Sequence, residues 1–211
     1  FTKVRFKDFG TLYLSQGEEE SLAIEADAQV LEELTSEVRN GTLILGIGED
    51  WWDRISKVIS SVFSGEQSKV NYYLTVKELE ELNISGNCKL ECASLKADEL
   101  ALKVSGLGDL AFAQLECSKL DVRISGRGEF TAAGRAAQQE VRISGSGEVM
   151  AAGLASQSLR IVISGQGNAT VRVEESLDIT ISGLGQVNYY GRPKLRQVIS
   201  GLGKSKRLNG E

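Results

Sequence analysis

A short motif, an aliphatic residue followed by Ser-Gly, recurs in phase over more than half of this chain of 211 residues. It occurs seven times, and its serines lie 18 to 20 residues apart: Ser85, Ser105, Ser125, Ser144, Ser164, Ser182 and Ser200. Such regular self-similarity is typical of repeat proteins, in which each unit buries its apolar side only against its neighbours. A unit of this length is too short for a pair of helices. The Asn or Cys position that marks leucine-rich repeats is also missing.

Within each repeat, apolar and polar residues alternate. Counted from the serine as position 0, positions −5, −3 and −1 are apolar in most copies, as in Leu159, Ile161 and Ile163 before Ser164. Glycine occupies +1 in all seven copies and +3 in six, and a second apolar alternation follows at +5 and +7. A period of two predicts a strand with one buried side. The sequence therefore predicts an all-β fold, a parallel β-solenoid with one coil per repeat and coils about 4.8 Å apart.

The remaining segments are less regular, and we expect them to belong to the same single domain over residues 1–211. Residues 75–205 hold the regular repeats. Residues 1–48 have strand character without a fixed period, which predicts irregular N-terminal coils that cap one end; within them, residues 30–38 fit either helical turns or a polar strand. Residues 49–66 break the strand pattern because Trp52, Ile55 and Ile59 fall on one helical stripe. This predicts a short amphipathic helical insertion that packs on the solenoid or docks a partner.

Composition excludes several classes of function. The chain has no histidine, which rules out a Ser-His-Asp triad, a Cys-His pair and histidine metal ligands. Cys88, Cys92 and Cys117 lack the paired spacing of a zinc site, so we expect them to be small buried side chains. A net charge of −5 gives no general attraction to nucleic acid. No apolar run is long enough for a transmembrane helix. Because the sequence does not open on methionine, we expect an exported protein whose signal peptide has been removed.

The glycine turns and the acidic residues beside them predict no cofactor and no metal. A dinucleotide site needs a third glycine and a following helix, which the Gly-x-Gly tripeptides lack. Position +4 is acidic only at Asp109, Glu129 and Glu148, one per coil, whereas calcium takes six to eight oxygen ligands. Parallel solenoids include polysaccharide lyases and hydrolases, but the outward acids here do not recur as close pairs. We therefore predict no catalytic residues.

Three aromatic doublets are the best candidates for a contact surface, because exposed aromatic rings anchor interfaces. Neighbouring side chains on a strand point to opposite sides, so we expect one ring of each doublet to lie inside and the other outside. The candidate residues are Trp51, Trp52, Tyr72, Tyr73, Tyr189 and Tyr190.

The chain also resembles a known family, the head GIN domain family of bacterial autotransporter adhesins. The resemblance rests on Phe1–Leu14 with the following Ser-Gln-Gly, on residues 40–45, on Leu79–Gly86 and on the Ser-Gly-x-Gly repeats. It covers essentially the whole chain and implies a right-handed, single-stranded β-helix in an exported bacterial protein. It supplies no catalytic residues, and the insertion at 49–66 is longer than the family pattern.

We therefore expect a non-catalytic binding or structural module of the cell surface or periplasm, of an adhesin-like kind. Its expected partner is a polysaccharide or another surface protein. The alternative is a carbohydrate-active enzyme, a polysaccharide lyase or hydrolase, built on a β-helix.

Overall fold

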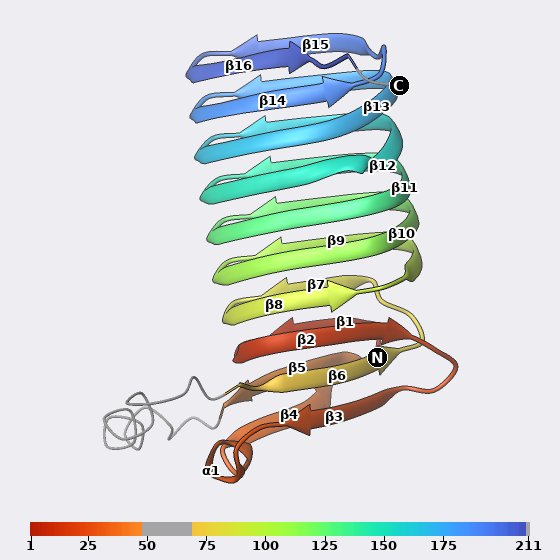
Figure 1. Cartoon of the computed structure of the whole chain (residues 1–211), viewed down its shortest axis with the longest axis vertical. Helices are drawn as coiled ribbons and strands as arrows, with labels where there is room; N and C mark the ends of the chain where they lie inside the picture. Colours follow the sequence, from red (N-terminus) through yellow and green to blue (C-terminus); the bar gives the residue numbers. More distant parts are fainter. Residues whose placement is uncertain (48–68, 210–211) are drawn as a thin grey trace.

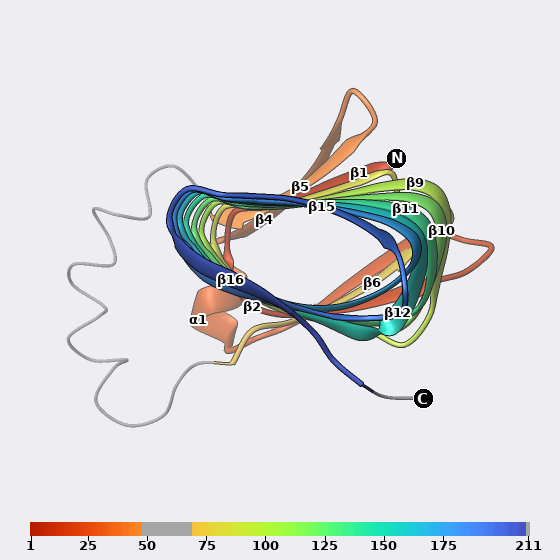
Figure 2. The same ribbon diagram turned by 90° about the horizontal axis from the view of Figure 1, so that it is seen from above.

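The computed structural model describes residues 1–47 and 69–209, and these form a parallel β-solenoid of about 6 turns. The coils stack along one axis (Figure 1) and enclose a flattened interior when viewed along it (Figure 2). The fold class predicted from the repeat is therefore confirmed. The insertion expected over residues 49–66, with Trp51 and Trp52, lies outside the described residues.

The first of the two long faces, which we call the β1 face, is built mainly from the strand that precedes each Ser-Gly turn. Its ladder contains β4 (Leu34–Arg39), β5 (Thr42–Ile47), β1 (Lys3–Phe6), β7 (Glu81–Ile84) and β9 (Leu95–Val104), then the second halves of β10 (Leu107–Ile124), β11 (Arg127–Ile143), β12 (Ser146–Ile163) and β13 (Gln166–Ile181), and finally β15 (Lys194–Ile199).

The opposite face, the β2 face, is built from the strand that follows each turn. Its ladder contains β3 (Ser21–Glu25), β6 (Asn71–Val76), β2 (Phe9–Gln16) and β8 (Asn87–Cys92), the first halves of β10 to β13, and then β14 (Leu184–Tyr190) and β16 (Leu202–Arg207). Strands β10 to β13 pass from one face to the other without a break in strand structure. The register shift between Phe112 and Leu115, where β10 pairs with β11, marks this second, rounded corner.

The interior is filled by the alternating apolar positions of the repeat. Ile124, Ile143, Ile163 and Ile181 occupy position −1 in successive coils, and each is at most 1% exposed. Side chains of one kind therefore stack in register along the axis, and each buried aliphatic side chain stabilises the fold by about 1.5–3 kcal/mol. Phe112, at position +7 of its repeat, and Phe130, at position +5 of the next, make a diagonal contact with ring centroids 6.1 Å apart.

At the Ser-Gly corner, consecutive coils are joined by paired hydrogen bonds. The amides of Ser144 and Gly145 both donate to the carbonyl oxygen of Ile124, at 2.9 and 3.2 Å, and the amide of Ser146 donates to Gly126 at 2.9 Å. The same arrangement recurs at the other corners of the stack. These bonds hold neighbouring backbones close together at the turn.

At the N-terminal end, the order of coils in space differs from their order in the chain. β1 pairs in parallel with both β5 and β7, and β2 pairs in parallel with both β6 and β8. The first coil of the chain therefore lies between two coils formed later. Below them, β3 and β4 run antiparallel to their neighbours, and the short helix α1 (Ala28–Leu31) connects them. Residues 30–38, whose sequence fits either helical turns or a polar strand, contain the end of α1 and most of β4.

Candidate binding surface

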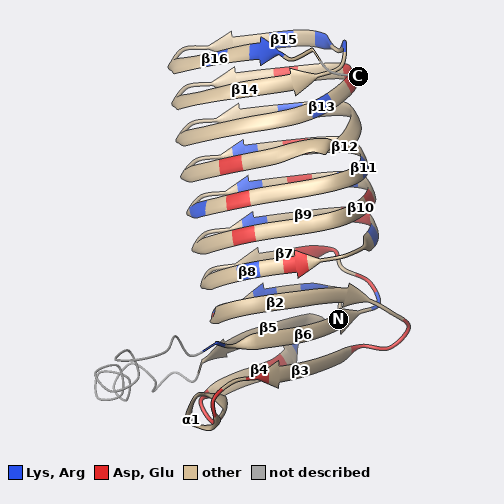
Figure 3. Cartoon of the chain, viewed as in Figure 1, with Lys and Arg blue, Asp and Glu red and all other residues tan. Residues whose placement is uncertain are grey.

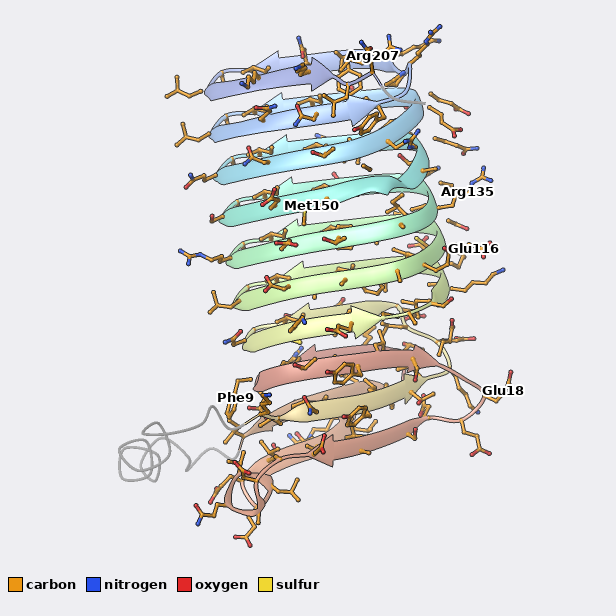
Figure 4. All side chains as sticks on the ribbon, in the orientation of Figure 1. Phe9, Glu18, Glu116, Arg135, Met150 and Arg207 are labelled. Carbon is orange, nitrogen blue, oxygen red and sulfur yellow. The ribbon has the colours of Figure 1, made fainter. Side chains whose placement is uncertain are left out.

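The outer side of the β2 face carries two straight columns of side chains. The column at +4 contains Glu25, Asn71, Thr11, Lys89, Asp109, Glu129, Glu148, Asn168, Gln186 and Lys204; the column at +6 contains Ala23, Tyr73, Tyr13, Glu91, Ala111, Thr131, Met150, Thr170, Asn188 and Lys206. Each column places one side chain on every coil, and Figure 4 labels one of them, Met150 of the +6 column. A ligand that lies along the axis would meet a regular series of groups.

A pair of tyrosines forms the largest exposed aromatic group in this surface. Tyr13 of β2 and Tyr73 of β6 are neighbours in the +6 column, with ring centroids 5.1 Å apart and ring planes inclined by only 12°. They are 37% and 44% exposed. On the other side of Tyr73 the column continues with Ala23, whose side chain is small. One face of the Tyr73 ring is therefore not covered by a large neighbouring side chain.

Hydrogen bonds fix the outer end of Tyr73. Its hydroxyl donates to Oε2 of Glu25 at 3.1 Å, and Nδ2 of Asn71 donates to the same oxygen at 3.0 Å. The bonds from Asn71 and from Tyr73 hold the pKa of Glu25 below its usual value, so this carboxylate is charged at neutral pH. Next to the pair, Lys89 contacts Glu91 at 2.7 Å. The tyrosines are thus bordered by fixed donors and acceptors.

The structure places some of the predicted aromatic residues inside the solenoid and others on its outer surface. Tyr72 is fully buried and Tyr189 is 8% exposed, whereas Tyr73 points outward and Tyr190 is half-buried. The guanidinium of Arg172 lies 5.2 Å from the centre of the Tyr190 ring. Trp51 and Trp52 lie outside the described residues. Tyr13 was missed, although its place between the buried Leu12 and Leu14 signals an outward ring.

A buried acid lies behind this surface. Asp8 is 2% exposed; it accepts a hydrogen bond from the amide of Phe9 at 2.7 Å and another from the hydroxyl of Tyr72. Burial raises the pKa of Asp8 more than these two bonds lower it, and burial also raises the pKa of Tyr72. Because Asp8 is enclosed by the coil, it cannot contact a substrate from solution.

The acidic residues and the cysteines do not form metal sites in the described part of the chain. Asp109, Glu129 and Glu148 follow one another in the +4 column, one per coil, and no group of three or more His, Cys, Asp or Glu residues could hold a metal ion there. Cys88, Cys92 and Cys117 are free and buried. Burial raises the pKa of their thiols to about 12, 11 and 11 respectively, which disfavours the thiolate needed for nucleophilic chemistry or metal binding.

The β1 face has a shallow polar hollow of about 280 Å³. Ser158 and Ser176 leave it open between longer side chains; the other lining residues are Lys119, Gln138, Gln139, Glu140, Leu159, Arg160 and Asp178. Its two acids, Glu140 and Asp178, are separated in their column by Arg160. Glu140 contacts Arg142 at 2.6 Å and Arg160 at 3.9 Å. Glu140 is thus engaged in ion pairs, and Arg160 lies between it and Asp178, so the two carboxylates do not face one another as a catalytic pair.

Comparison with known proteins identifies relatives by sequence pattern and by fold. A family model described as "Putative auto-transporter adhesin, head GIN domain" matches residues 1–193. No curated protein matches the chain. In the described residues, no helix is long and apolar enough to cross a membrane.

Several crystal structures share the fold over nearly the whole chain. A "putative adhesin" from Bacteroides fragilis is 23% identical with a TM-score of 0.87, and the alignment covers 99% of this chain and 92% of that one. A "putative lipid binding protein" from Parabacteroides distasonis is 20% identical with a TM-score of 0.69, covering 99% and 93%. A "putative adhesin" from Parabacteroides merdae is 20% identical with a TM-score of 0.63, covering 99% and 92%. At these identities the likeness establishes a common fold.

Proposed function

Because the chain belongs to the family described as "Putative auto-transporter adhesin, head GIN domain", we propose that it is a non-catalytic binding module that acts outside the cytoplasm, at the cell surface or in the periplasm. We further propose that it binds polysaccharide along the β2 face, with Tyr13 and Tyr73 as the central contact. The fixed, exposed tyrosine pair is the observation that carries this proposal.

The chemistry of the pair suits a sugar chain. Tyrosine offers a flat apolar surface with a polar tip, and its side chain loses little conformational entropy when it is bound. The open ring face above Ala23 gives room for a pyranose ring, and the charged Glu25 and the amide of Asn71 supply an acceptor and a donor for hydroxyl groups. A straight column with one position per coil fits an extended polymer better than a compact ligand.

The test is a glycan array followed by titration calorimetry with the best polysaccharide. Tyr73→Ala should weaken binding by at least about tenfold, the effect of losing about 1.4 kcal/mol. Tyr13→Ala should weaken it as well. Val162→Ala, at an outward position of the opposite β1 face, is the control and should bind like the wild type.

Two results would refute the proposal. Equal affinities of the three variants for the polysaccharide would show that the tyrosine pair does not contact it. Release of new reducing or unsaturated sugar ends in proportion to protein concentration would instead assign an enzyme activity.

A further inference from the structure

The two ends of the solenoid carry opposite charge. Residues 18–37, which include β3, α1 and most of β4, contain no Lys or Arg but eight acids: Glu18, Glu19, Glu20, Glu25, Asp27, Glu32, Glu33 and Glu37. Residues 192–207, the last coil, contain no acid but six basic residues: Arg192, Lys194, Arg196, Lys204, Lys206 and Arg207. The blocks occupy opposite ends of the stack (Figure 3). The charge therefore runs from acidic to basic along the axis.

The six basic side chains of the last coil are exposed, and none forms an ion pair within residues 1–47 and 69–209. Elsewhere along the solenoid many basic residues do have acidic partners, as Lys103 has Glu81 at 2.7 Å. The positive charge of this end is thus left without a partner in the described chain.

The last coil is also incompletely covered. β15 pairs only with β13, and β16 only with β14, so each has one free edge among the described strands. Val198 and Leu202 are 56% and 80% exposed. Repeat proteins need a polar cap over each end, and exposed strand edges are sites of pairing with other chains.

The acidic end has free strand edges that match those of the basic end in length. β3 and β4 each pair with a single described strand, and they have 5 and 6 residues against 6 each in β16 and β15. Val38 and Leu31 are exposed there. Glu25 and Lys204 are the two ends of the same +4 column. When two solenoids share an axis, the Lys204 end of one column continues into the Glu25 end of the next.

We propose that the basic end of one copy docks on the acidic end of a second copy, so that the solenoids stack head to tail. Opposite charges attract only in this orientation, because two basic ends or two acidic ends repel each other. The contact is heterologous: each copy keeps one free basic end and one free acidic end, so the assembly grows into a filament unless it closes.

Sedimentation velocity of the full chain tests the proposal. The mean mass should rise with protein concentration at about 0.01 M salt and return to that of the monomer at about 1 M, since the screening length falls from about 30 to about 3 Å. Lys204→Glu with Lys206→Glu should abolish association. Arg127→Glu with Arg135→Glu changes the net charge equally at exposed positions of a middle coil and should leave association intact.

Reversing the charge at both ends distinguishes a loss of end-to-end binding from a loss of the fold. The variant Glu25→Lys with Glu37→Lys should also be monomeric when no other variant is present. Mixing this variant with the Lys204→Glu, Lys206→Glu variant should restore association, because each then presents an end that complements the other. Circular dichroism and thermal melting identify any variant that fails to fold.

Three results would overturn the proposal: a monomer at every concentration and salt, equal loss of association in the middle-coil control, or no association in the mixture of folded variants. Binding of a monomeric wild type to vesicles of anionic phospholipid, lost in Lys204→Glu with Lys206→Glu, would instead assign the basic end to a lipid surface.

Discussion

The hydroxyl of Tyr72 donates a hydrogen bond to the carboxylate of Asp8, 64 residues away, inside the N-terminal end of the solenoid. Asp8 stands beside Gly86, at the corner position that glycine fills in every repeat. The pair therefore joins two segments at the point where the regular coils begin.

Replacing Asp8 by asparagine should change how stability depends on pH. Burial raises the pKa of Asp8, so the native state keeps a proton that the unfolded chain has already released. The contribution of Asp8 to the free energy of unfolding is therefore complete below the ordinary carboxyl pKa and falls as pH rises through the raised value. Asp8→Asn should remove this fall, so its stability relative to the wild type should increase from pH 4 to pH 8 in urea melts.

The matched variant is Tyr72→Phe. It removes a hydrogen bond that lowers the pKa of Asp8, and it should cost about 1.5–3 kcal/mol at pH values where the Asp8 carboxylate is ionised. Because the ionised carboxylate loses its partner, the pKa of Asp8 should rise further, and the fall in stability should extend to higher pH than in the wild type. Parallel pH profiles for the wild type and both variants would contradict this account of the pair.

The three cysteines should be chemically inert in the folded protein. Cys88, Cys92 and Cys117 are buried, and burial raises the pKa values of their thiols to about 12, 11 and 11. Since the thiolate is the reactive form, Ellman's reagent at pH 8 should modify them only at the rate at which the protein unfolds. In denaturant, all three should react at once. Rapid modification of any thiol in the native protein would show that its site opens without unfolding.

Removal of a coil from either end should have unequal effects. A chain that ends at Gly191 loses only β15 and β16, which pair with one neighbour each, so it should still melt cooperatively at a lower temperature. A chain that starts at Gly17 loses β1 and β2, which separate two other coils, and should not fold cooperatively. Calorimetry of the two chains makes the comparison; a sharp transition for the chain that lacks residues 1–16 would contradict it.

The repeat was sufficient to predict the coils, because one local pattern sets both the alternation and the turn. The buried positions −5, −3 and −1 could be read directly from residues such as Leu159, Ile161 and Ile163. The insertion of β1 between β5 and β7 could not be, since no local pattern decides which of several alternating strands pair. The stacking of Tyr13 on Tyr73 and the bond from Tyr72 to Asp8 both depend on that insertion. The candidate surface was therefore predicted only as separate residues.

The two glycines of one corner, Gly145 and Gly147, should differ in how well they tolerate a side chain. Neither Gly145 nor Gly147 has a positive φ, so the need for glycine at these positions comes from the lack of room for a side chain and not from the backbone conformation. A Cβ on Gly145 would fall on the backbone carbonyl oxygens of Gly126 and Ser125 in the preceding coil. The three atoms nearest to a Cβ on Gly147 would all belong to isoleucine side chains, among them Cδ1 of Ile124 at 3.1 Å and Cγ2 of Ile143 at 3.2 Å.

Gly145→Ala should therefore destabilise the protein by about 3 kcal/mol or more, whereas Gly147→Ala should cost about 1 kcal/mol, because isoleucine side chains shift more easily than a hydrogen-bonded backbone. The clash at Gly145 cannot be relieved locally, since the amides of Ser144 and Gly145 are held to the carbonyl oxygen of Ile124. The corner lies in a central coil, so fraying at the ends does not relieve the strain. Urea melts of the two variants give the loss in the free energy of unfolding for each. Equal losses, or a larger loss for Gly147→Ala, would mean that close backbone approach does not explain why position +1 is glycine.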